Sequence, residues 1–154
     1  MATSTAARGN TAQHCSHSLH SPPGRPSRAV LDLGVRPTAP GRARAWTRRI
    51  LRAWELTCLS DSAELVVSEL STNAILATRP LDGPFIRLTL TLNQGELGIS
   101  VRDYSPGVPR PVNVGDEDEN GRGLHLVEAM SARSGWYAPG DGAPGKVVWA
   151  ALPS

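Results

Sequence analysis

The sequence predicts an α+β fold, a two-layer α/β sandwich in which helices cover one face of a mostly antiparallel sheet. Apolar residues recur every three or four positions in three stretches, which is helical spacing. Two pairs of apolar or alternating segments are joined by turns that contain glycine, which is typical of hairpins. Helices combined with hairpins favour one packed layer of each kind.

Length and composition narrow the function classes. The 154 residues suit one domain. The net charge of +2 argues against a dedicated nucleic-acid binder, which carries a strong basic excess. No run approaches the ~18 apolar residues of a membrane span. Two cysteines are too few for a disulfide framework and no apolar secretory segment is present, so we expect a cytoplasmic protein.

We divide the chain into a disordered leader, residues 1–28, and one domain, residues 29–154. The leader has almost no large apolar side chains and cannot offset its ordering entropy. Closely spaced His and Cys residues can bind a metal, but a flexible tail with incidental ligands is the favoured interpretation. The residues concerned are His14, Cys15, His17 and His20.

The domain is expected to begin with a strand and two helices. Residues 29–35 are predicted as the strand, after which Pro37 and Pro40 mark a turn and a helix start. Residues 41–57 have helical spacing on their apolar face. The opposite face is interpreted as solvated and not as a patch for an acidic partner. It carries Arg42, Arg44, Arg48, Arg49 and Arg52.

The second helix is expected from about Asp61 to Ala77. Asp61 followed by Glu64 resembles a capping box, and Pro80 and Gly83 end the helix. The remaining pattern predicts, in order, strand 85–92, turn 93–96, strand 97–102, a long loop 104–120, helix 123–131, strand 135–137 and strand 146–152. A loop of that length is usually functional.

Glu69 and Asn73 form the first motif that could carry chemistry. They are four residues apart, so both project from one side of the second helix. Asn73 could ligate Mg²⁺, and Glu69 could act as a base or orienting group for an attacking nucleophile. Taken alone, the two residues are more simply explained as a polar pair at the margin of an ordinary helix.

Two further motifs follow along the chain. Asp103 ends a strand and could accept a hydrogen bond from the exocyclic amine of adenine, with Gly107 letting the backbone approach the base. Alone, this stretch is a plain turn. Gly121 and Gly123 precede a helix and could bring backbone N–H groups to a phosphate, with Arg122 as a nearby cation. One Gly-x-Gly is weak evidence by itself.

Together and in this order, the motifs resemble the GHKL ATPase superfamily, which includes gyrase B and the ATP domains of histidine kinases. The most similar branch is that of the anti-sigma-factor serine kinases. The resemblance covers about residues 29–152 and nearly everything but the leader. The matching stretches are residues 64–74, 101–106, 121–127 and 145–149.

The resemblance implies a Bergerat-type sandwich with ATP between the helices and a flexible lid at residues 104–120. It implies that Asn73 ligates Mg²⁺, that Glu69 takes the proton from a serine hydroxyl of an anti-sigma antagonist, and that Asp103 selects adenine. The phosphates would lie against Gly121, Arg122, Gly123 and Leu124. The implied partners are this antagonist and a sigma factor, with a possible homodimer and with neither nucleic acid nor a membrane.

The chain departs from the branch in places. Members often carry a His where this chain has Ala77, and a Thr where it has Val147, which removes a hydroxyl from the adenine network. The acidic run 116–119 is interpreted as a solvated loop. We expect Lys146 at the surface and a structural role for His125.

Three functions stay open. A serine kinase is favoured by Glu69, because a pure binder has no use for a base. A non-catalytic module, which holds ATP or nothing and grips a sigma factor or antagonist, is favoured by Ala77 and Val147. The ATP domain of a histidine kinase ranks last, because it needs a helical segment with a phospho-accepting His, and the leader is not helical.

Overall fold

The computed structural model describes residues 27–78, 85–104 and 119–153, and in the last range the side chains from residue 125 onward. It confirms the α+β sandwich. Five strands form one sheet in the order β1-β2-β3-β5-β4, with antiparallel neighbours throughout. They are β1 (Ser27–Gly34), β2 (Phe85–Asn93), β3 (Glu96–Asp103), β4 (Arg133–Tyr137) and β5 (Lys146–Pro153).

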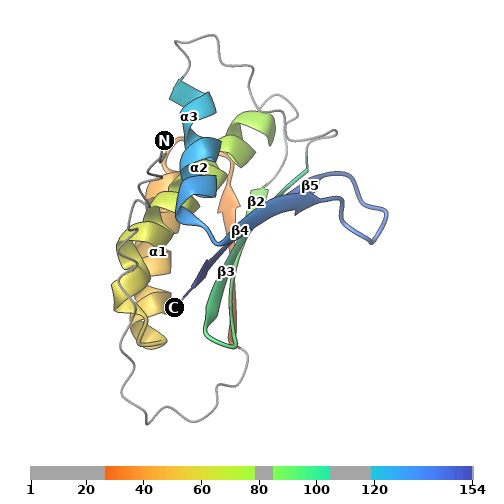
Figure 1. The fold of residues 1–154 in the computed structure, drawn as a ribbon. Helices are drawn as coiled ribbons and strands as arrows, with labels where there is room; N and C mark the ends of the chain where they lie inside the picture. The colour runs from red at the N-terminus through yellow and green to blue at the C-terminus, as the bar shows by residue number, and fades with distance from the viewer. Residues whose placement is uncertain (1–26, 79–84, 105–118, 154) are drawn as a thin grey trace, which may run out of the picture.

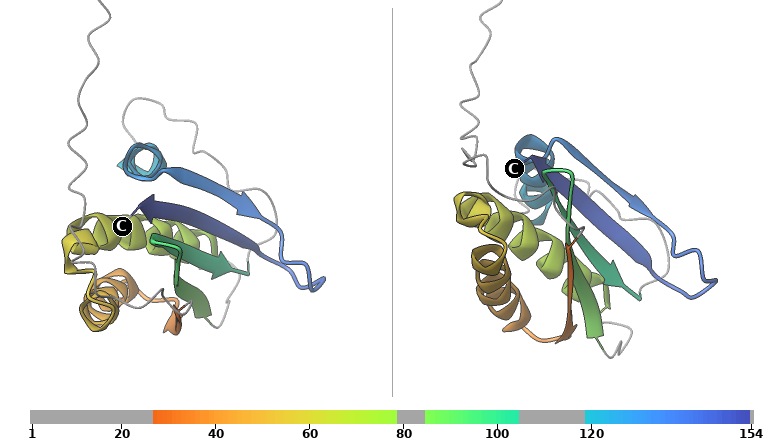
Figure 2. Two further views of the ribbon diagram at one scale, coloured as in Figure 1. Left: turned by 60° about the horizontal axis from the view of Figure 1, so that its bottom comes forward. Right: turned by 90° about the horizontal axis from the view of Figure 1, so that it is seen from below.

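The helices lie on one face of this sheet (Figure 1, Figure 2). They are α1 (Ala39–Ala53), α2 (Ser60–Thr78) and α3 (Glu119–Met130), with a short 3₁₀ turn, η1 (Thr57–Leu59), before α2. β1 begins at Ser27, two residues before the strand start expected at residue 29. The His and Cys residues of the leader lie outside the described residues.

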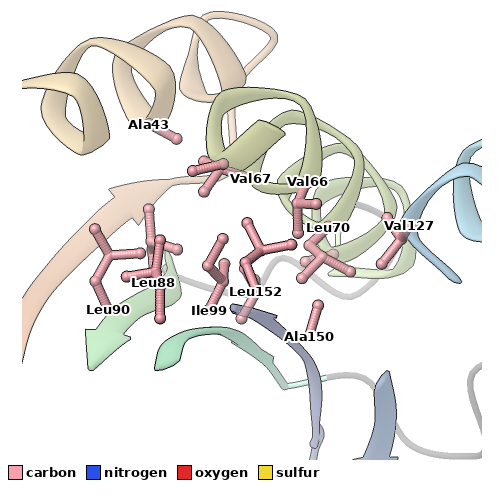
Figure 3. Packing of buried hydrophobic residues seen from close by; sticks show 14 of the residues in the cluster. Ala43, Val66, Val67, Leu70, Leu88, Leu90, Ile99, Val127, Ala150 and Leu152 are labelled. Carbon is pink, nitrogen blue, oxygen red and sulfur yellow. The ribbon is translucent and has the colours of Figure 1, made fainter. Parts of the chain in front are cut away.

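The core fills the space between α1, α2 and the inner face of the sheet. Side chains alternate between the two faces of a strand, so every second residue of β3, and of β2 as far as Leu90, is buried, as the sequence predicts, and Leu92 is half-buried. Figure 3 shows Val67 of α2 close to Ala43 of α1, above Leu88 and Leu90 of β2. Each fully buried aliphatic side chain stabilises the fold by about 1.5–3 kcal/mol.

α1 ends earlier than the expected residue 57 because a helix stop follows it. Glu55 has φ 59°, and the backbone N–H of Leu56 donates to the carbonyl of Leu51 at 2.8 Å. This is the bonding of a Schellman motif. The position with positive φ is usually glycine, so a glutamate there gives no helix-stop signal in the sequence.

The expected capping box at Asp61 is wrong. α2 already begins at Ser60, directly after η1, so Asp61 lies within the first helical turn. Glu64 instead accepts two hydrogen bonds from the guanidinium of Arg48, at 2.8 and 2.6 Å. Arg44 also reaches α2, donating to the hydroxyl of Ser68 at 2.8 Å. Two arginines of the face expected to be solvated therefore join α1 to α2.

The ion pair to Arg48 makes a prediction about pH. Its two hydrogen bonds lower the pKa of the Glu64 carboxyl. A lowered pKa stabilises the fold above the unfolded-state pKa, and this contribution is lost as the pH falls through the folded-state pKa. Glu64→Gln should therefore lower the melting temperature at neutral pH and leave it unchanged in strong acid. The decrease should be small, because the pair is partly exposed. A melting difference that is independent of pH would contradict an electrostatic origin.

Two observations concern the expected compartment. None of the described helices is long and apolar enough to cross a membrane. Cys58, in η1, is disulfide-bonded. The cysteine count does not predict such a bond, so the expectation of a reducing compartment gains no support from this residue.

Candidate functional site

Glu69 and Asn73 lie on the same face of α2, as expected from their spacing, and both side chains are partly buried. The Nδ2 atom of Asn73 is buried and has no hydrogen-bond partner within the described residues. In the same part of the chain, no hydrogen bond or ion pair engages the Glu69 carboxylate. Because buried polar groups are normally hydrogen-bonded, an orphaned amide beside an uncommitted carboxylate indicates room for a ligand.

The direction of α2 brings this pair toward one end of the sheet. Figure 3 shows Val66 and Leu70 of α2 pointing toward Leu152 and Ala150 of β5, with Val127 of α3 beside Leu70. Residue numbers rise along α2 from Val66 to Leu70 where they fall along β5 from Leu152 to Ala150, so the two elements run in opposite directions. The residues of α2 that follow Leu70 therefore approach the first residues of β5.

A buried ion pair occupies this end of the sheet. Asp103 ends β3 and is 1% exposed, and Lys146 begins β5 directly opposite it and is 7% exposed. The Nζ atom of Lys146 lies 3.0 Å from Oδ2 and 3.3 Å from Oδ1 of Asp103. The surface position expected for Lys146 is therefore wrong. The register places its side chain on the inner face, where the opposing carboxylate offsets the burial of its charge.

Gly145 holds this pair in register. It has φ 116°, and a Cβ added there would lie 2.1 Å from the backbone oxygen of Asp103. Gly145→Ala should therefore destabilise the chain by about 1–3 kcal/mol or more, through backbone strain and the clash. Urea denaturation measures the change. Gly140→Ala is the matched control, since nothing lies within 4 Å of the added methyl group. Equal stability of the two variants would contradict the role given to Gly145.

Ring contacts and an ion pair hold the residues on either side of Asp103 in place. The Tyr104 ring packs edge-on against Phe85 with centroids 5.3 Å apart, and the Arg102 guanidinium lies 5.1 Å from the centroid of the Tyr104 ring. Arg102 also pairs with Asp141 at 3.3 Å. The pKa of Asp141 is lowered by a hydrogen bond from the backbone N–H of Ala143 and by Arg102. The sequence gives no signal for this bracing, because its members are far apart in the chain.

The glycine motif lies within α3 and not before it, which corrects the expectation. Because α3 begins at Glu119, its first two turns include Gly121, Arg122, Gly123 and Leu124. Glycine weakens a helix by about 1 kcal/mol without forbidding it, and no proline interrupts the stretch. The unpaired N–H groups of the first turn still favour an anion.

Several expected site features lie outside the described residues. They are Gly107, residues 116–118 of the acidic run and the side chains of the glycine motif. His125 is described, and it is exposed, with Nδ1 3.8 Å from a Glu128 carboxylate oxygen. It therefore packs against no core in the part of the chain that is described, and the structural role expected for it finds no support.

The donor set fits Mg²⁺ bound together with a phosphate. Within the described ranges, no group of three or more His, Cys, Asp or Glu side chains could hold a metal ion. Mg²⁺ does not need such a cage, since it is commonly held by one or two side chains with phosphates and waters. The amide oxygen of Asn73 could be one such ligand, whereas its Nδ2 atom, unpartnered in the described part of the chain, is a hydrogen-bond donor and suits a phosphate oxygen. Asp103 supplies a buried carboxylate acceptor at the end of β3.

One comparison with known proteins identifies the family of the chain. A family model for the histidine kinase-like ATPase domain matches residues 34–151. The match includes Glu69, Asn73 and Asp103 together with all three helices. No curated protein matches the chain. Since the family model spans most of the sequence and the fold agrees with it, the chain belongs to the histidine kinase-like ATPase domain family.

Proposed function

We propose that this chain binds Mg·ATP and acts as a protein serine kinase on an anti-sigma antagonist, and that it binds a sigma factor. The observation that carries the proposal is the Glu69 carboxylate, one helical turn from the orphaned Nδ2 atom of Asn73 and uncommitted within the described residues. Family membership supports the nucleotide. The kinase step and both partners are inferred from the resemblance to the anti-sigma-factor kinases.

Each site residue has a role in this proposal. Asn73 holds Mg²⁺ through its amide oxygen and donates from Nδ2 to a phosphate oxygen. Asp103 accepts from the exocyclic amine of adenine, and the first turn of α3 directs N–H groups toward the phosphates. When bound, Mg·ATP would supply the γ-phosphoryl group, which passes to the serine oxygen as its bond to the departing ADP breaks. Glu69 accepts the proton of the attacking serine hydroxyl.

The test is Glu69→Gln. This variant should keep Mg·ATP binding in titration calorimetry and lose phosphoryl transfer by about 10²–10⁴-fold, the usual contribution of a general base. Transfer is followed as radiolabel on serine of a candidate antagonist protein. Asp61→Asn is the control, because Asp61 is an exposed carboxylate in the first turn of the same helix. Equal transfer by Glu69→Gln and wild type would rule out the proposed base.

The second candidate is a non-catalytic module that holds a nucleotide or nothing and acts by gripping its partner. The Lys146–Asp103 ion pair favours it, because adenine must share a carboxylate that is already engaged. Val147 also favours the non-catalytic module, because it lacks the hydroxyl that could take part in binding adenine. If titration of the wild-type chain with millimolar Mg·ATP gives no heat in calorimetry, the result favours a module that acts on its partner without a bound nucleotide.

A surface for a protein partner is available on the edge strand β4. Its Trp136 and Tyr137 are 45% and 53% exposed, and exposed aromatic side chains are enriched at protein interfaces. An edge strand also offers unpaired backbone groups to another chain. These features support binding of the proposed partners or of a second copy.

A further inference from the structure

We propose that the groove between the edge strand β1 and helix α1 binds an extended, acidic segment of a partner protein, which adds a strand to β1. The groove has a volume of about 300 Å³ and is lined by Leu31 of β1 and by Arg42, Ala45, Trp46 and Arg49 of α1. None of the residues given a role in nucleotide binding is among them. The inference therefore does not rest on the proposed nucleotide chemistry.

The floor of the groove is apolar and incompletely covered. Leu33 of β1 is fully buried under the helices, whereas Leu31, two residues earlier on the same face of the strand, is only partly buried. Trp46 is also partly buried, and Ala45 beside it is exposed. In both views of Figure 2, α1 is the helix at the β1 end of the sheet. An apolar side chain placed between Leu31 and Trp46 would remove more of both from water.

β1 offers a regular backbone edge to a further strand. It is the first strand in the sheet order, so every second residue directs its N–H and C=O groups away from β2. Its eight residues pair with β2 without a bulge, and the strand contains neither lysine nor proline. Bulges, lysine and proline are devices that prevent pairing at an edge. The backbone therefore favours an extended peptide over a helix.

The arginines of α1 fall into groups on different sides of the helix. Arg44 and Arg48 are engaged by Ser68 and Glu64 of α2. Arg42 and Arg49 are exposed at the groove. Within the described residues, no hydrogen bond or ion pair engages either of these two guanidinium groups. Two uncommitted cations beside an apolar floor are complementary to a segment that carries carboxylates next to an apolar residue.

The spacing of the two arginines predicts the pattern of this segment. Arg42 and Arg49 are separated by about 10 Å along the helix axis, at 1.5 Å per residue. In an added strand, residues four apart share a face and are separated by about 13 Å. The long side chains of arginine and glutamate can span the difference. The pattern is therefore acidic, any residue, apolar, any residue, acidic, with the apolar side chain against Leu31 and Trp46.

The experiment titrates the full chain, labelled with nitrogen-15, with the capped peptide Thr-Glu-Thr-Val-Thr-Glu-Thr, and follows amide shifts by NMR. The shifts should be largest in β1 and at the indole N–H of Trp46. The matched peptide with Gln in place of both Glu residues should bind about 2–30-fold more weakly, the range for two partly exposed ion pairs.

Variants at exposed positions test the groove itself. Arg42→Gln/Arg49→Gln should bind the two peptides equally. Arg52→Gln is the control, because Arg52 is an exposed arginine of α1 that does not line the groove, and it should keep the wild-type preference. Ala45→Glu should weaken binding of the Glu peptide more than the isosteric Ala45→Gln, since only the first places a negative charge in the groove. Melting without peptide verifies that each variant is folded.

Several results would overturn the inference. They are no amide shifts at millimolar peptide, shifts confined to elements other than β1 and α1, and equal binding of the two peptides by the wild type. Sedimentation and hydrogen exchange of the free chain test other occupants. A dimer that Ala45→Glu dissociates would assign the groove to a second copy. Slow exchange of all β1 amides in a monomeric chain would assign the edge to another part of this chain. Either result also overturns the inference, and neither bears on Mg·ATP binding.

Discussion

Asn73→Ala is expected to abolish Mg·ATP binding while leaving the chain as stable as the wild type or more stable. The Nδ2 atom of Asn73 is buried and without a partner within the described residues, so its removal relieves a desolvation cost of about 1–3 kcal/mol. Alanine also has the highest helix propensity. The same change removes the proposed Mg²⁺ ligand. Calorimetry with Mg·ATP and thermal melting without it measure the two effects separately.

Thr72→Ala is the matched control for this prediction. Thr72 is the preceding residue of α2, but it lines a pocket with Pro40 and Leu76 to which Asn73 does not contribute. This variant should bind Mg·ATP as the wild type does. If Asn73→Ala binds Mg·ATP as tightly as the wild type, the Asn73 amide is not a ligand of the nucleotide or its metal ion. A large fall in its melting temperature would show that the amide stabilises the fold and is not reserved for a ligand.

The parts of the fold that the sequence predicts well are those set by local chemistry. The alternation in β2 and β3 gives their faces because a strand places successive side chains on opposite sides. The turn between them has φ 48° at Gln94 and φ 76° at Gly95, which suits a two-residue hairpin. The spacing of Glu69 and Asn73 places both on one helical face by geometry alone.

The parts that could not be predicted depend on residues far apart in the chain. The burial of Lys146 follows from the β3–β5 register, which no local pattern specifies. The early start of α3 is hidden because glycine and polar residues give no apolar period, although they can be helical. The tie between Arg48 and Glu64 needs two helices packed side by side. Long-range pairing therefore decides the burial of Lys146 and the tie between Arg48 and Glu64, whereas the start of α3 is a local feature that the apolar pattern does not reveal.

Lys146→Met is expected to destabilise the unliganded chain by about 3–5 kcal/mol, because removal of one partner leaves the other charge buried and uncompensated. Asp103 is 1% exposed, so water cannot take over the role of the ammonium without a change in structure. A loss of this size is a large share of the roughly 5–15 kcal/mol that stabilise a typical domain. Urea denaturation of the single variant gives the free energy of unfolding directly.

The double variant Asp103→Leu/Lys146→Met should recover most of that loss, because it continues the apolar rungs of the same face. Arg87→Met is the surface control. Arg87 pairs with Asp32 at 2.7 Å, with both side chains more than 40% exposed, and its loss should cost no more than about 1 kcal/mol. If Lys146→Met costs as little as Arg87→Met, the ion pair is hydrated in solution and its burial contributes little to the free energy of unfolding. If the double variant is stable but no longer binds Mg·ATP, the ion pair serves the nucleotide and the fold does not require it.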